Sequence, residues 1–131
     1  MVQLVALLST GKGTWTEVAA LIRRDEFDEL ILLTNAFGKQ AFSQLPSKKT
    51  HVVVCDFEKS VAVLSEAMIA RLKPLIGFND IAVNMSSGTG HEHMALFAAL
   101  MRLGTSFRLV TMHEGSILDL SADPAFNRLE K

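Results

Sequence analysis

The architecture of this chain is best predicted from residues 81–104, which read IAVNMSSGTGHEHMALFAALMRLG. The segment opens with a short apolar run without polar alternation, as in a strand buried on both faces of a sheet. A turn rich in glycine and hydroxyl groups follows, and then a stretch with helical spacing. Residues 94–101 are all apolar, so the predicted helix has no polar face over two turns and needs cover on both sides.

The rest of the chain repeats this strand-to-helix alternation. Four more apolar runs predict strands at residues 4–8, 30–33, 51–54 and 107–112. Helices are predicted from the Thr14-x-x-Glu17 capping-box spacing onward, briefly near 40–44, and over about 58–73 and 91–103. Strands and helices that alternate in this way favour parallel pairing with right-handed crossovers. We therefore predict an α/β fold, a three-layer Rossmann-like sandwich with a mainly parallel sheet of five or six strands.

The length of 131 residues suits one domain. We expect residues 1–131 to form it, with a core at 1–112 and an extension at 113–131 that adds either an edge strand or a short helix. Since the sheet covers only one side of the helix at 91–103, its apolar octet predicts a homodimer through this fourth helix. Cover by residues 115–131 is the alternative.

The charge balance and the cysteine content of the chain limit which binding partners and which cellular compartment we expect. Thirteen Lys and Arg nearly balance fourteen Asp and Glu, which argues against a broad field suited to duplex DNA or an anionic membrane. The one cysteine, Cys55, lies in an apolar run, and we expect a buried, inert thiol. The first eight residues carry no basic group, and no run of about 20 apolar residues occurs. We expect a cytoplasmic protein.

Polar residues follow each predicted strand, at the sheet edge where open parallel sheets bind ligands and helix amino termini present free N–H groups. The loops after the first and fourth strands combine glycines with hydroxyls, and the first adds a lysine. Such loops suit a phosphate-bearing ligand, although each could also be a plain tight turn. The candidate residues are Ser9, Thr10, Gly11, Lys12, Gly13, Asn35, Asn84, Ser86, Ser87, Gly88, Thr89, Gly90 and His91.

The triplet His91-Glu-His93 has the residue types of a metal site but not the spacing. Residues two apart on a helix point in nearly opposite directions, and no Pro-Cys-x-x-Cys follows as in zinc deaminases. We expect neither a metal nor a cofactor.

Residues 81–104 resemble the CARF (CRISPR-associated Rossmann fold) family, in which a strand, an Asn or Asp, a Thr-Gly-Gly-Thr-Lys-like turn and an Ala-rich helix follow one another. Residues 8–12, LSTGK, resemble the family's other motif, and together the two span about residues 1–112. Gly90 and His91 stand where the lysine is expected, so Lys12 or His91 would supply the cation. The resemblance implies a two-fold dimer with the fourth helix near its axis and a cyclic oligoadenylate lying across both copies.

A lone domain of this type could bind the messenger as a CRISPR-linked sensor or sink, or cleave it as a metal-independent ring nuclease. In cleavage a ribose 2′-hydroxyl attacks the neighbouring phosphate, and the protein supplies geometry and charge. Lys12 would then stabilise charge, Ser9 and Ser87 would position the ring, and His91 would carry a proton. Two alternatives stay open: an enzyme acting on a mononucleotide or small phosphorylated metabolite, and a regulatory or scaffold subunit that docks a partner through the fourth helix.

Overall fold

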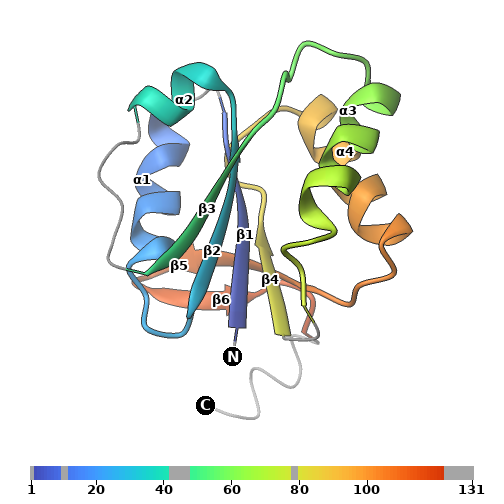
Figure 1. Cartoon of the computed structure of the whole chain (residues 1–131). Helices are drawn as coiled ribbons and strands as arrows, with labels where there is room; N and C mark the ends of the chain where they lie inside the picture. Colours follow the sequence, from blue (N-terminus) through green and yellow to red (C-terminus); the bar gives the residue numbers. More distant parts are fainter. Residues whose placement is uncertain (1, 10–11, 42–47, 78–79, 123–131) are drawn as a thin grey trace.

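The chain forms a six-stranded sheet with helices on both faces (Figure 1). The computed structural model describes residues 2–9, 12–41, 48–77 and 80–122. The elements follow in the order β1 (Val2–Leu8), α1 (Lys12–Ile22), β2 (Glu29–Thr34), α2 (Ala36–Ala41), β3 (Lys49–Val54), α3 (Val61–Leu72), β4 (Asp80–Asn84), α4 (Gly90–Arg102), β5 (Arg108–His113) and β6 (Ser116–Asp119).

The strand order is β3-β2-β1-β4-β5-β6, and β6 alone pairs antiparallel. The predicted α/β class and mainly parallel sheet are therefore confirmed. Starting from the central strand β1, the chain adds β2 and β3 on one side and then returns to place β4 on the other. The carboxyl ends of β1 and β4 thus flank a topological switch point, where open α/β sheets bind ligands.

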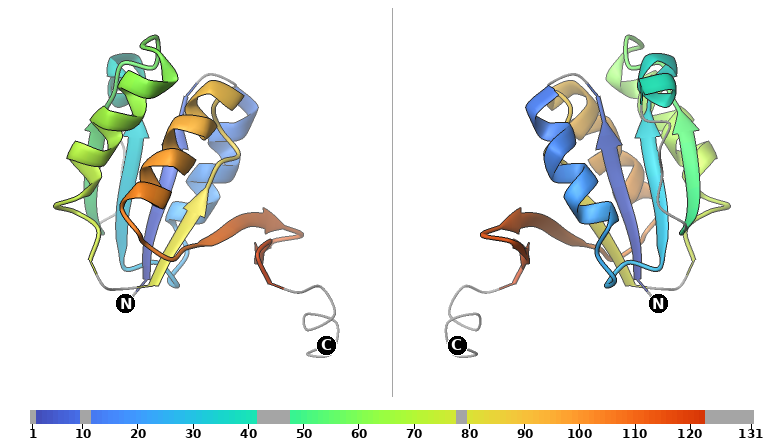
Figure 2. Two further views of the ribbon diagram at one scale, coloured as in Figure 1. Left: turned by 90° about the vertical axis from the view of Figure 1, so that its right-hand side faces the viewer. Right: turned by 90° about the vertical axis from the view of Figure 1, so that its left-hand side faces the viewer.

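Two apolar layers enclose the sheet, with α3 and α4 over one face and α1 over the other (Figure 2). Side chains along β1 alternate between the layers because strand residues alternate in direction. Val5 and Leu7 pack under α3 and α4, while Leu4 and Leu8 pack under α1. Both faces of the central strands are buried, which explains their unbroken apolar runs.

Helix α4 is closed at both ends by its own sequence. The Thr89 hydroxyl accepts from the backbone N–H of Glu92 at 3.4 Å, and the Glu92 side chain accepts from the Thr89 N–H, which completes a capping box. Gly104 follows the helix with φ of 69°, a left-handed conformation that favours glycine.

The apolar octet at 94–101 divides between two environments. Ala95, Leu96, Ala99 and Leu100 are buried in the core under the sheet, in agreement with the prediction for one side of this helix. The side chains of Met94, Phe97 and Met101, by contrast, are 62%, 41% and 69% exposed. We call these three residues the α4 apolar stripe.

The structure corrects several predicted boundaries. Helix α1 begins at Lys12 and not at Thr14, and the Glu17 carboxylate accepts a 2.9 Å hydrogen bond from the Thr111 hydroxyl. Helix α2 begins before the predicted 40–44, and residues 42–44 lie outside the described part of the chain. In the extension, residues 116–119 form the edge strand β6. No helix within the described ranges is long and apolar enough to span a membrane.

Candidate functional site

The loops after β1 and β4 meet at the switch point. The backbone N–H of Ser9 donates to the Ser87 hydroxyl at 2.9 Å, and the Ser9 hydroxyl donates to the Glu92 carboxylate at 2.5 Å. All three residues are at most 5% exposed. The two loops that the sequence singled out are therefore held together by buried hydrogen bonds at the edge where β1 and β4 end.

Glu92 is the central polar group of this contact. Burial disfavours its charged form, but hydrogen bonds from Ser9, from the Thr89 hydroxyl and from the Thr89 backbone outweigh that cost, so the pKa of Glu92 lies below its ordinary value. The carboxylate is thus ionised at neutral pH, in the position where a phosphate would otherwise meet the α4 amino terminus.

Glu92 is not among the site residues that the sequence predicts. The sequence does carry a signal for Glu92 as a capping residue, because Thr89-x-x-Glu92 has the same capping-box spacing as Thr14-x-x-Glu17. The contact to Ser9, 83 residues earlier, had no local signal.

Asn84 shapes the turn that follows β4. It is 1% exposed, and its side-chain N–H groups donate to the Val110 carbonyl at 2.9 Å and to the Ser86 hydroxyl at 3.0 Å. A longer contact of 3.4 Å reaches the Glu17 carboxylate, and the Asn84 oxygen accepts from the Ser86 N–H. Asn84 therefore connects β4, β5 and α1, and it fixes the path of the loop next to Ser87.

Gly88 lies where the fourth loop turns toward α4. Its φ of 104° belongs to the left-handed region, a backbone conformation that residues other than glycine rarely adopt. A Cβ there would also stand 3.3 Å from the His93 Nε2 atom. The same His93 nitrogen is 3.0 Å from the Ser87 carbonyl, so the loop is packed against the first turns of the helix.

The two histidines of the His91-Glu-His93 triplet point to different partners. His91 is exposed, and its Nε2 lies 2.7 Å from the Lys59 carbonyl on the loop before α3. His93 contacts the fourth loop instead. No cluster of three or more His, Cys, Asp or Glu side chains that could hold a metal ion occurs in the described ranges.

The remaining candidates lie around the first and second loops. Thr10 and Gly11 fall outside the described residues, while Lys12 and Gly13 form the first turn of α1. The single tryptophan, Trp15, donates from its indole N–H to the Ser9 carbonyl at 2.5 Å. Asn35 follows β2, where its side-chain oxygen accepts from the Gly38 N–H at 2.7 Å.

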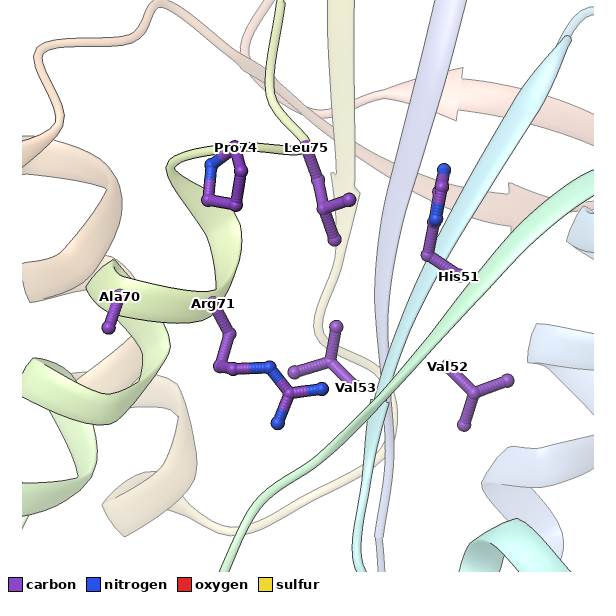
Figure 3. A pocket seen from close by; sticks show the side chains of 7 residues that line it. All are labelled: His51, Val52, Val53, Ala70, Arg71, Pro74 and Leu75. Carbon is purple, nitrogen blue, oxygen red and sulfur yellow. The ribbon is translucent and has the colours of Figure 1, made fainter.

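The described residues also line two pockets outside the contact of Ser9 with Ser87 and Glu92. One, of about 410 Å³, opens at the carboxyl ends of β2 and β3 between Asn35, Phe37 and Phe57. The other, of about 310 Å³, lies between β3 and α3 (Figure 3). The polar groups of the second pocket serve the fold: Arg71 donates to the Val54 carbonyl at 3.4 Å, and His51 bonds the buried Glu29 at 2.7 Å.

Comparison with known proteins supports the fold. No family model and no curated protein matches the sequence. Among solved structures, Can2 from Sulfobacillus thermosulfidooxidans, determined in complex with cyclic tetra-adenylate, is similar with a TM-score of 0.59 and 14% identity. The likeness covers 92% of this chain and 37% of that chain. At this identity the match shows a shared Rossmann-like fold, and this chain corresponds to little more than a third of Can2.

Proposed function

We propose that this protein binds a cyclic oligoadenylate, or a similar phosphate-bearing nucleotide, between the first and fourth loops of a homodimer. The observation that carries the proposal is the buried contact of Ser9 with Ser87 and Glu92, because it joins the two loops at the switch point of the sheet. The likeness in fold to a protein solved with cyclic tetra-adenylate agrees with the resemblance of residues 81–104 to the CARF family.

We infer a cytoplasmic, CRISPR-linked sensor or sink, and the contacts bear on which loop holds the ligand. The Glu92 carboxylate already occupies the α4 amino terminus, so the ligand phosphates would be held by the first loop. That loop offers Lys12, the hydroxyl of Thr10 and the N–H groups at the start of α1. Asn84, Ser86 and Ser87 would shape the opposite wall.

Ring cleavage is the finer version of the proposal. It would use Lys12 to stabilise the pentavalent phosphate, Ser9 to position the ring and His91 as proton carrier. In the present geometry the Ser9 hydroxyl donates to Glu92 and the His91 ring bonds the Lys59 carbonyl. Both side chains would have to exchange these partners for the ligand, so we rank binding above cleavage.

The α4 apolar stripe supports the homodimer. Met94, Phe97 and Met101 are spaced by three and four residues and therefore lie along one side of the helix. Phe97 also meets Phe107 edge to face, with ring centroids 5.5 Å apart. Large apolar side chains grouped on one exposed face are typical of an interaction surface, and a second copy would bury the same three residues from its own α4.

The test is direct titration of the purified protein with cyclic tetra-adenylate and cyclic hexa-adenylate in EDTA, followed by separation of the products. Binding of either ring with the ring recovered intact supports a sensor or sink, and a linear product supports the nuclease. If neither ring binds, the proposal is wrong. Tight binding of a mononucleotide without either ring would favour an enzyme of small phosphorylated metabolites instead.

A further inference from the structure

The pocket at the carboxyl ends of β2 and β3 has the size and lining of a site for a flat aromatic ligand. Its volume of about 410 Å³ lies within the range of small-molecule sites. Most of its wall is apolar, from Ala36, Phe37, Val54, Cys55 and Phe57, and polar groups come from Asn35, Asp56 and Glu58. A few polar groups in an apolar wall are typical of sites that both bind and orient a ligand.

Two aromatic rings belong to this wall, from different elements. Phe57 is partly buried and packs against the core under α3, so its ring is held in place. Phe37, on α2, is 71% exposed, the largest exposed fraction among the large apolar side chains of the described chain. An aromatic ring left in water at the rim of a pocket is the platform on which nucleic-acid-binding proteins stack a base.

The pocket shares its edge of the sheet with the first loop. The Thr34 hydroxyl donates to the Leu8 carbonyl at 2.7 Å, and the Cys55 N–H donates to the Thr34 carbonyl at 2.7 Å. The ends of β1, β2 and β3 are therefore joined side by side. Two strand spacings amount to about 10 Å, a separation that the sugar of a nucleotide can bridge between a phosphate at the first loop and a base in this pocket.

We propose that this pocket is the base-binding site of the ligand and that it takes an amino-substituted purine, adenine, stacked on Phe37. The proposal rests on the proposed function, since it assumes that the phosphates lie at the first loop. Asp56 supplies selectivity: its Oδ1 atom accepts from the Glu58 N–H at 3.1 Å, and its Oδ2 atom has no hydrogen-bond partner in the described part of the chain. That oxygen can accept from the exocyclic amine of adenine, which is a donor.

The test compares AMP, IMP and cyclic tetra-adenylate on the full chain by calorimetry. Phe37→Ala should weaken AMP binding by about five- to 150-fold, the range for one lost stacking contact, while Phe37→Trp keeps it. Leu120→Ala, which also truncates a more than half-exposed apolar side chain but on the segment after β6, is the matched control and should change nothing. Asp56→Asn should reduce the preference for AMP over IMP, because its amide N–H can donate to the inosine oxygen.

The outcomes separate this proposal from the proposed function. If the ring binds and neither the ring nor AMP responds to Phe37→Ala, the base pocket is wrong and the proposed function stands. If AMP binds in a Phe37-dependent way and the ring does not bind, the base pocket stands and the cyclic oligoadenylate is excluded as the ligand. If wild-type protein binds neither AMP nor the ring, both fail. Because Phe37 is exposed, an unchanged melting temperature will show that the variant is folded.

Discussion

Ser9 and Glu92 are separated by 83 residues in sequence and joined by a 2.5 Å hydrogen bond in the structure. The hydroxyl belongs to the end of β1 and the carboxylate to the first turn of α4. Together with the bond from the Ser9 N–H to the Ser87 hydroxyl, this contact holds the two loops proposed to bind the ligand at a fixed distance. It also places a negative charge between them, so any anion must approach from the side of the first loop.

Removing the Glu92 carboxylate should loosen the site and destabilise the protein. In Glu92→Ala the Ser9 hydroxyl and the Thr89 N–H lose their buried acceptor. We expect a loss of about 2 to 3 kcal/mol in the free energy of unfolding, measured with urea. Glu92→Gln keeps an acceptor oxygen and should lose about 1 kcal/mol.

Glu66→Ala is the control for this prediction. Glu66 pairs with Arg102 on the surface, with side chains 63% and 57% exposed, and such pairs contribute about 0 to 1 kcal/mol. If the Glu92 and Glu66 variants lose equal amounts of unfolding free energy, the Ser9–Glu92 contact stabilises the fold no more than an exposed ion pair does.

Local patterns in the sequence are sufficient to predict some elements of this fold and not others. The central strands β1, β2 and β4 follow from short apolar runs, since a strand buried on both faces is mostly apolar. The contact of Ser9 with Glu92 and the turn-forming role of Asn84 depend on long-range packing, which no local spacing encodes. Helix α4 shows both cases, because the octet predicts a helix covered on two sides but cannot tell buried Leu100 from exposed Met101.

That distinction gives a test of the homodimer. Met101→Asp adds a charge to the α4 apolar stripe, so it should shift a dimer to a monomer in light scattering while the melting temperature of the monomer is kept. Leu100→Asp places the charge in the core and should unfold the chain instead. Val63→Asp, on an exposed position of α3 (53% exposed), is the matched surface control. A wild-type protein that is already monomeric at high micromolar concentration would exclude the dimer.

Acid stability should depend on Glu29, which is buried at the start of β2. Burial disfavours its charged form, but hydrogen bonds from Gln3 and His51, with the charge of Lys49, outweigh this, and the pKa of Glu29 is lowered from 4.5. Above pH 4.5 both folded and unfolded states are ionised, so the stabilisation is fully present. As the pH falls below that value the unfolded state binds the proton first, and the stabilisation is lost until the folded carboxylate is also protonated.

Urea unfolding between pH 7 and pH 3 measures this effect. The free energy of unfolding should fall below about pH 5, and Glu29→Gln should make the fall less steep. Glu114→Gln changes an exposed carboxylate in the turn between β5 and β6 and serves as control. An identical pH profile for wild type and Glu29→Gln would contradict the assignment.

Binding at the first loop should be visible through Trp15. It is the only tryptophan of the chain, and its indole N–H donates to the Ser9 carbonyl at 2.5 Å. An anion held by that loop changes the surroundings of the indole, so titration with cyclic tetra-adenylate should change the intrinsic fluorescence. Lys12→Ala should raise the Kd about 10- to 150-fold, which corresponds to the loss of about 1.5 to 3 kcal/mol for one charged hydrogen bond. Lys73→Ala, at the carboxyl end of α3, is the control and should leave the Kd unchanged. If Lys12→Ala also leaves the Kd unchanged, Lys12 is not part of the site.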